Sequence, residues 1–320
     1  MSLSFLTPGG ALVGLIGALA LVALLATLRR SRTVDAELGL APPRRRSVGI
    51  DVTLLVVVSG LVALACAQPV ISSSARLQGR EGVEVYVVFD ITRSMLAQRA
   101  PSEPDRLERA RSFAKELRAE IPEARVGVVS LTDRVRPHLF PTLSENAFVS
   151  VVNRAIGIER PPPDRRTRRA TSLNALGDMG RAAYFDALAT RRLVVVLTDG
   201  ETLPVDFETL RTRLVDARVA TIFVHVWGGN ERVIGPDGRP DAAYRPDPTA
   251  LRSLRRVAGA IDGAVFTEGQ QREVTDAVRR LTAGGPMIEQ GRELRPVELA
   301  PPIAAVTVLP LLLLLRRRSL

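Results

Sequence analysis

The chain has 320 residues, which is enough for one sizeable domain with additional segments, and its formal net charge is +10. Such a basic balance raises nucleic acid as a partner. However, aromatic residues make up only 4% of the chain and no zinc-finger spacing is present, so we predict no nucleic-acid binding. Lys115 is the only lysine and does not follow a glycine-rich loop, which excludes a P-loop. The only cysteine, Cys66, excludes an internal disulfide and a cysteine-cluster metal site.

Three apolar segments have lengths suited to crossing a bilayer, although the last is somewhat short. The first lacks a basic region in front of it, which favours a retained helix over a cleaved signal peptide. Arginine clusters lie within 29–46 and at Arg316–Arg318, and the positive-inside rule puts both in the cytoplasm. We therefore predict a multi-pass protein of the inner or plasma membrane with an extracytoplasmic domain. The expected parts are two transmembrane helices in 1–71 (about 11–28 and 52–68) joined by a cytoplasmic basic loop, a domain over 81–281, a linker over 282–299, and a transmembrane helix with a basic tail over 300–320.

Strands and helices alternate through the region between the membrane segments, which is typical of a parallel sheet with crossover helices. Short β-branched runs predict strands at 83–89, 125–131, 191–198, 219–227 and 263–266, with an edge strand at 134–140. Helical periodicity predicts helices at 105–121, 145–156, 172–189, 207–217, 248–258 and 273–281. The segment 228–248 is rich in Gly, Pro and Asp, which indicates a surface insertion. The expected fold class is α/β, with a doubly wound, mostly parallel sheet and flanking transmembrane helices.

Polar side chains follow two of the predicted strands. Asp90, Thr92 and Ser94 occupy alternate positions after the first strand, and Asp199 follows the strand at 191–198. Because the carboxyl ends of parallel strands meet at one sheet edge, the two carboxylates should lie close together. Thr171 offers another hydroxyl between them. Hard oxygen donors of this kind suit Mg²⁺ or a similar cation, whereas the alternative is that they cap unrelated helices.

The ordered set resembles the metal-ion-dependent adhesion site (MIDAS) of the von Willebrand factor type A (vWA) family, an Asp-x-Ser-x-Ser loop with a distant Thr and a distant Asp. The resemblance assigns Asp90, Thr92, Ser94, Thr171 and Asp199 as metal ligands. Thr92 stands where Ser is usual, and Arg168-Arg169-Ala170 stand where a glycine normally precedes the distant Thr. The continuation after Ser94, with Asp105-Arg106-Leu107-Glu108-Arg109-Ala110-Arg111, is similar to the membrane-anchored Bat (aerotolerance) subgroup.

The resemblance implies a protein–protein interaction role and not an enzyme. Its expected cofactor is Mg²⁺, or Mn²⁺ or Ca²⁺, and a partner protein supplies an acidic residue to the metal. It also implies other vWA or Bat-type membrane subunits and a MoxR-type AAA ATPase as partners. A surface adhesin is an alternative. A phosphatase-like hydrolase using Asp90 is a weaker one, because Ile91-Thr92 lacks the second acid that would transfer a proton.

Several other residues admit a functional and a structural interpretation. The basic segment Arg160–Arg169 is either a rim that attracts an acidic partner or a solvated loop. His138 and His225 are interpreted as packed or surface side chains. Glu201, two residues beyond Asp199, either approaches the site or, as we predict, is an exposed loop acid, and Trp227 is predicted to lie in the core or at a strand end. No catalytic residues are assigned.

Overall fold

The computed structural model describes residues 2–37, 46–158, 171–181, 184–235 and 237–318. The contacts divide the chain into two compact units. One contains Met1–Ala75 and Arg292–Leu320, and the other contains Arg76–Gly291. A three-stranded sheet has the order β1 (Ser2–Phe5), β2 (Pro69–Arg80) and β11 (Met287–Glu298), and its last two strands belong to both units. The segment 282–299, predicted as a linker, is therefore largely a β-strand, because its backbone groups pair in this sheet.

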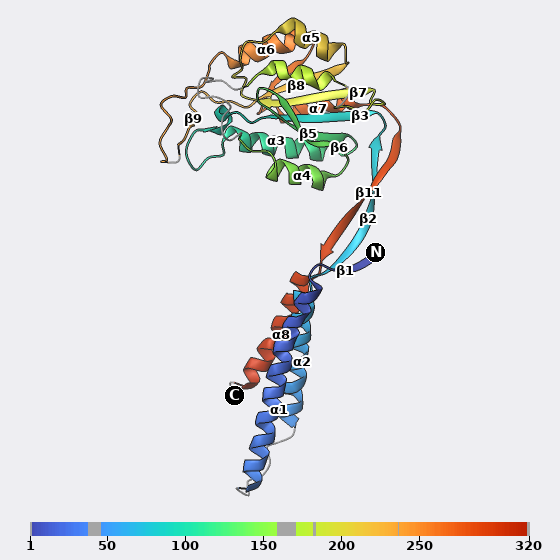
Figure 1. Cartoon of the computed structure of the whole chain (residues 1–320), viewed down its shortest axis with the longest axis vertical. Helices are drawn as coiled ribbons and strands as arrows, with labels where there is room; N and C mark the ends of the chain where they lie inside the picture. Colours follow the sequence, from blue (N-terminus) through green and yellow to red (C-terminus); the bar gives the residue numbers. More distant parts are fainter. Residues whose placement is uncertain (1, 38–45, 159–170, 182–183, 236, 319–320) are drawn as a thin grey trace. The chain divides into compact units, whose positions relative to one another are not determined.

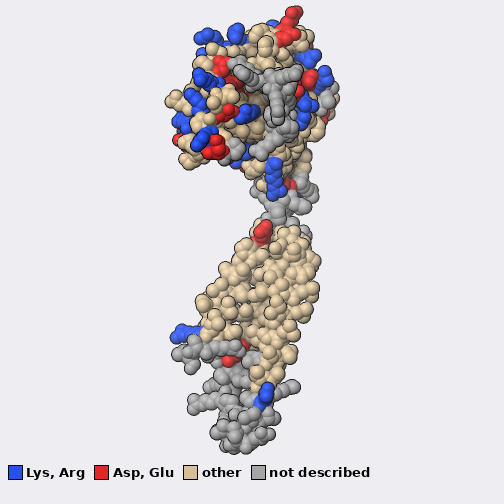
Figure 2. All heavy atoms as spheres, turned by 60° about the vertical axis from the view of Figure 1, so that its left-hand side comes forward, with Lys and Arg blue, Asp and Glu red and all other residues tan. Residues whose placement is uncertain are grey.

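The first unit contains the helices α1 (Gly14–Glu37), α2 (Arg46–Cys66) and α8 (Ala300–Arg318), and a short 3-10 helix, η1 (Pro8–Val13), precedes α1. Two stretches, Pro8–Thr27 and Gly49–Cys66, are long and apolar enough to cross a membrane, and Ala300–Arg316 is shorter. None of the residues in the two longer stretches is fully buried in the protein, and the view in Figure 2 shows few charges on the described surface of this unit. Both helices extend into the segment predicted as a basic loop between about 28 and 52, since α1 continues to Glu37 and α2 begins at Arg46, while 38–45 lie outside the described residues.

Small residues bring α1 and α2 together. A Cβ atom added at Gly17 would lie 1.9 Å from Ser59 Oγ, and one at Gly14 would lie 2.8 Å from Ala63 Cβ. Such close approach of two helices is how small residues stabilise helix pairs in a membrane.

The second unit is built on a six-stranded sheet of order β10-β8-β7-β3-β5-β6. The strands are β3 (Val83–Asp90), β5 (Arg125–Leu131), β6 (Val135–Thr142), β7 (Arg191–Thr198), β8 (Val219–His225) and β10 (Ala264–Thr267). All neighbouring pairs are parallel except β5 and β6, which are antiparallel. The predicted doubly wound, mostly parallel sheet is therefore confirmed, and the predicted edge strand pairs antiparallel with its neighbour.

Helices cover both faces of this sheet (Figure 1). On one face α3 (Arg106–Glu120), α4 (Glu145–Arg154) and α7 (Gln271–Thr282) pack on a core that includes Val85, Val87 and Phe89. On the other face a 3-10 helix, η3 (Leu173–Gly180), lies with α5 (Phe207–Val215) and α6 (Ala250–Ala260) against Tyr86 and Val88. Every residue of β3 is buried, as expected for the central strand of a sheet covered on both faces.

The helix predicted at 172–189 is wrong: the chain forms η3 and then turns. Gly180 approaches α5 so closely that a Cβ atom there would lie 2.1 Å from Arg213 O, and Gly177 is crowded by the Arg213 side chain. Asn174 also bonds outside the helix, donating to Pro204 O and accepting from Asp206 N. Two glycines within eight residues weaken an α-helix, and these contacts select a different backbone.

The insertion at 228–248 is also not a simple surface loop. Its strand β9 (Arg232–Val233) pairs antiparallel with β4 (Ala97–Gln98), which directly follows the Asp90–Ser94 loop. Glu231 is only 1% exposed, and its carboxylate accepts hydrogen bonds from Arg106 and Arg109 of α3. The composition indicated irregular structure correctly, but it did not predict that Glu231 is buried against the domain.

The α1–α2 contact predicts the effect of adding one methyl group. Gly17→Ala should lower the free energy of unfolding of the full chain in detergent by about 1–3 kcal/mol, since overpacking forces the helices apart. Gly60→Ala in α2 is the matched control, because a Cβ atom at Gly60 meets nothing within 4 Å. Thermal unfolding of both variants tests this. Equal stability of the two would contradict the close packing.

Candidate metal centre

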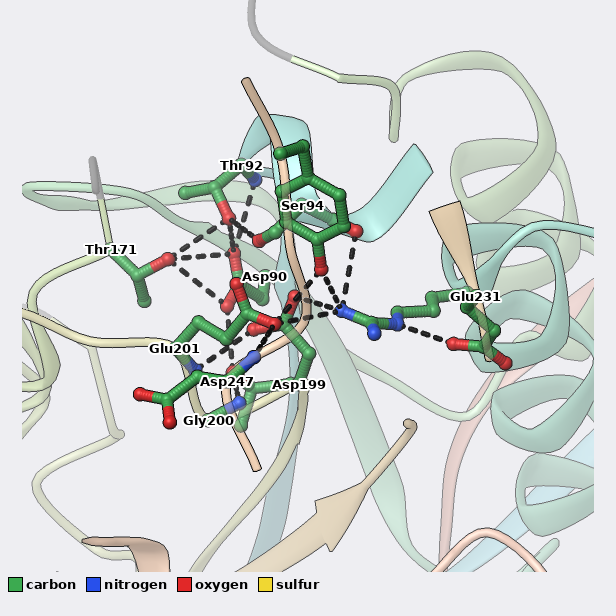
Figure 3. Close-up of polar contacts among 12 residues, drawn as sticks. Asp90, Thr92, Ser94, Thr171, Asp199, Gly200, Glu201, Glu231 and Asp247 are labelled. Atoms are coloured by element: carbon green, nitrogen blue, oxygen red, sulfur yellow. Dashed lines mark hydrogen bonds and ion pairs between the residues drawn. The ribbon is translucent and has the colours of Figure 1, made fainter. Parts of the chain in front are cut away.

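The Asp90 carboxylate is the centre of a cluster at the carboxyl edge of the sheet (Figure 3). Asp90 is the last residue of β3 and is fully buried. Its Oδ1 accepts hydrogen bonds from Thr92 Oγ1 at 2.7 Å and Thr92 N at 3.0 Å, and its Oδ2 accepts one from Thr198 Oγ1 at 2.6 Å. The carboxylate is thus fixed by neutral donors from two strand ends.

Three hydroxyl groups gather beside this carboxylate, and Figure 3 shows them converging. Thr92 Oγ1 lies 3.1 Å from Ser94 Oγ, in a loop that turns through the 3-10 helix η2 (Arg93–Leu96). Thr171 Oγ1 lies 2.9 Å from Thr92 Oγ1 and 3.3 Å from both Asp90 oxygens. The structure therefore brings Thr171 to the Asp90 loop although its sequence neighbourhood departs from the family pattern.

Thr171 is positioned by two neighbouring loops. Leu203 N donates to Thr171 O at 2.9 Å, and the next residue, Ser172, donates through its backbone N to Thr132 O at 2.8 Å. The residues before Thr171, including Arg168-Arg169-Ala170 and the basic segment Arg160–Arg169, lie outside the described residues. The role of that segment stays a prediction.

Asp199 comes directly after the neighbouring strand and lies at the same edge of the sheet. It follows Thr198, the last residue of β7, and is fully buried. Its Oδ1 accepts from Glu201 N at 3.0 Å, and its Oδ2 accepts from Arg106 Nη1 at 2.9 Å. The parallel register of β3 and β7 places Phe89 opposite Leu197, so Asp90 aligns with Thr198 and Asp199 follows one residue further along the same edge.

Arg106 is a site residue that sequence reasoning missed. It is the first residue of α3, after the N-cap Asp105, and it is fully buried. Besides Asp199, it donates to Glu201 at 3.3 Å, to Glu231 at 2.6 Å and to the Tyr244 hydroxyl at 2.8 Å. One signal was available: a cation in the first turn opposes the helix dipole, so it requires an anionic partner elsewhere.

The prediction for Glu201 is corrected by the same network. Its side chain is 7% exposed, and it accepts hydrogen bonds from Arg106, Tyr244 and Asp247 N. A loop residue two positions after Asp199 is buried here because the insertion folds over it. His225 is packed as expected, with Nε2 donating to Asp199 O at 3.0 Å. His138 lies on the edge strand β6, and its Nε2 lies 2.8 Å from Ser130 Oγ of β5. Trp227 follows the end of β8 and stacks on His225.

Burial makes the charges of this cluster costly. Burial and, secondly, the charge of Asp199 raise the pKa of Asp90 to about 7, against the opposing hydrogen bonds from Thr198 and Thr92. The same two causes raise the pKa of Glu201. In the described part of the chain, Asp90, Asp199, Glu201 and Glu231 are carboxylates within this network that are at most 7% exposed, and Arg106 is its one fully buried cation. When all four carboxylates are ionised, they exceed the positive charges of Arg106 and of the partly exposed Arg109, which pairs with Glu231, so the cluster is then net negative.

These residues fit a divalent cation. Two carboxylates and three hydroxyls are hard oxygen donors, and an added positive charge would offset the repulsion between Asp90 and Asp199. In the described ranges no three Asp, Glu, His or Cys side chains gather as a metal cluster, so such a site depends on its hydroxyls. That Asp90, Thr92, Ser94, Thr171 and Asp199 would hold the cation stays a prediction.

No family model and no curated protein matches the chain. Among solved structures, an aerotolerance-related membrane protein from Bacteroides fragilis NCTC 9343 matches 62% of this chain and 98% of its own at 19% identity, with a TM-score of 0.50. BatB from Bacteroides thetaiotaomicron matches 63% of this chain and all of its own at 18% identity and TM-score 0.48. The SpRpn10 VWA domain matches 64% of this chain and 98% of its own at 13% identity and TM-score 0.41.

The first of these likenesses establishes the fold. The second unit is a doubly wound, mostly parallel α/β domain, as the alternation of strands and helices indicated.

The raised pKa of Asp90 predicts a pH dependence of stability in the presence of a chelator. Since this pKa is higher in the folded than in the unfolded chain, the folded state binds more protons and loses stability as the pH rises from about 4 to 7. Asp90→Asn has no carboxylate to ionise at this position and so does not lose stability in this way. Its Tm relative to the parent should therefore increase from pH 4 to 7 and then level off. A difference that does not change between pH 5 and 8 would contradict the assignment.

Proposed function

We propose that this protein is a membrane-anchored von Willebrand A domain that binds a divalent cation through Asp90, Thr92, Ser94, Thr171 and Asp199 and uses it to engage a partner protein. The observation that carries the proposal is the convergence of three separate loops on the buried Asp90 carboxylate. Hydroxyls placed within 3.3 Å of that carboxylate are explained by a shared ligand more readily than by helix capping. Thr92 precedes η2 and Ser172 precedes η3, and neither side chain makes a capping hydrogen bond.

The chain's own residues would set the properties of this site. Asp90 supplies a carboxylate that is held by neutral donors, and Thr92, Ser94 and Thr171 supply neutral oxygens. When bound, the cation, Mg²⁺ or else Mn²⁺ or Ca²⁺, supplies a Lewis-acidic position that a carboxylate from outside can complete. This is binding chemistry, and it requires no proton transfer from the protein.

The resemblance to Bat proteins supports a more specific setting. In that setting the chain works in an envelope complex with other vWA or Bat-type membrane subunits and with a MoxR-type AAA ATPase. The apolar α1 and α2 support attachment to a membrane, and the packing of α8 against α2 supports a third span. The basic segments 29–46 and 316–318 then favour an extracytoplasmic position for the domain.

Cation binding can be measured directly on the full chain in detergent. Titration with Mn²⁺, followed by electron paramagnetic resonance, should show one saturable site. Asp90→Ala should weaken it by about a hundredfold or more, because even residues that only orient a metal ligand cost 10–100-fold. Asp276→Ala removes an exposed carboxylate from α7 and is the matched control. Equal binding by the parent and Asp90→Ala would rule out this site.

The same variants distinguish the functions considered. Capture of envelope proteins by the full chain should require Mg²⁺ and fail for Asp90→Ala, whereas capture that is independent of the metal would contradict the mechanism. Asp90-dependent hydrolysis of a phosphate monoester would favour the phosphatase instead. Binding to external surfaces, and not to membrane subunits, would favour the adhesin.

The proposed topology is tested by reporter fusions. Alkaline phosphatase fused after Gly285 should be active, because this position would lie outside the cytoplasm, whereas a fusion within 38–45 should be inactive. A cytoplasmic reporter such as green fluorescent protein should give the reverse pattern at the same two positions. Activity of alkaline phosphatase at both sites would be incompatible with two retained spans.

A further inference from the structure

Arg106 connects the proposed metal centre to the 228–248 insertion. Its Nη1 donates to Asp199 Oδ2, whereas its Nε donates to Glu231 Oε2 of the insertion. Tyr244, also from the insertion, accepts from Nη1 at 2.8 Å, and its ring centroid lies 5.9 Å from the guanidinium carbon. A fully buried arginine therefore has anionic partners on both sides.

The two candidate carboxylates are compensated differently. Both oxygens of Asp199 are engaged, Oδ1 by Glu201 N and Oδ2 by the formal positive charge of Arg106. Asp90 accepts hydrogen bonds only from neutral hydroxyls and an amide among the described residues. As a result, one of the two negative charges available to a cation is already paired with a cation of the protein.

We infer that Arg106 limits the negative charge that the site presents to a bound cation, so that an external carboxylate from the partner is needed to complete its coordination. This inference rests on the proposed function and names the residue that makes the site selective for an acidic partner. Arg106 is a positioning and charge-setting residue, because among the candidate ligands it contacts the Asp199 carboxylate and, at 3.4 Å, the backbone oxygen of Ser94, but none of the three hydroxyls. An arginine suits this role because it stays protonated at every physiological pH.

The insertion has a defined part in this arrangement. Glu231 accepts from Arg106 through one oxygen and from Arg109 through the other, at 2.7 Å, and Gly228 N donates to it at 2.9 Å. Asp241 pairs with Arg93, which stands between Thr92 and Ser94. The insertion thus holds Arg106 in place and contacts the metal loop itself.

The geometry argues against a purely stabilising role for Arg106. Its Nη2 is buried without a hydrogen-bond partner among the described residues. Buried ion pairs often contribute little net stability, and an unpaired buried nitrogen reduces that contribution further. The unpaired Nη2 is compatible with a role for Arg106 that depends on its positive charge and not on its contribution to the stability of the fold.

The test compares cation affinity in variants of the full chain in detergent, with Mn²⁺ alone and then with Mn²⁺ plus acetate as the carboxylate probe. Arg106→Gln should bind Mn²⁺ about tenfold more tightly than the parent, because removing a nearby positive charge favours a cation. Acetate should tighten Mn²⁺ binding in the parent and do so less in Arg106→Gln. Arg106→Lys keeps the charge and should resemble the parent.

Arg109→Gln is the matched control. It removes the same charge from the other oxygen of Glu231, yet the described contacts of Arg109 include no candidate ligand. Its Mn²⁺ affinity should stay within about twofold of the parent, because Arg109 contacts no candidate ligand and the Coulomb interaction falls with distance. Thermal unfolding verifies that each variant is folded.

Equal or weaker Mn²⁺ binding by folded Arg106→Gln, with an unchanged acetate effect, would overturn the inference and leave Arg106 as a structural support. If Arg106→Gln does not fold, Arg106→Gln with Glu231→Gln is compared with Glu231→Gln alone, and the double variant should bind Mn²⁺ more tightly. Failure of the proposed function is distinguishable, since then neither the parent nor any variant would show a site that Asp90→Ala removes.

Discussion

The burial of two carboxylates at the ends of adjacent parallel strands is the constraint on which the rest of the site depends. Asp90 is the last residue of β3 and Asp199 directly follows β7, one residue further along the same sheet edge, and both are fully buried. Their mutual repulsion and desolvation are unfavourable unless other groups compensate. The hydroxyls around Asp90, the guanidinium beside Asp199 and the cation we propose would all stabilise these buried negative charges.

Compensation by Arg106 also explains why a Gly-, Pro- and Asp-rich insertion is folded onto the domain. A buried arginine in the first turn of α3 opposes the helix dipole, so further anionic or polar partners besides Asp199 stabilise it. Glu231 and Tyr244 supply those contacts from the insertion. The region that contributes least to the regular fold therefore contributes directly to the electrostatics of the site.

Much of the fold could be predicted from the sequence, because β-branched runs and helical stripes report burial directly. The strands at 125–131 and 191–198 and the convergence of Asp90 with Asp199 follow from that pattern and from the parallel topology. Arg106, the buried Glu201 and the 3-10 helix at 173–180 could not be predicted in the same way. Each is decided by long-range contacts, with the insertion or with α5, that leave no local periodicity.

The most direct test of the central claim is anomalous diffraction from crystals of the full chain grown with Mn²⁺. A single strong peak should lie among Asp90, Thr92, Ser94 and Thr171, with Asp199 close by and its link to Arg106 intact. A chain that crystallises with the same fold but shows no peak there, or shows the ion at another place in the domain, would contradict the account.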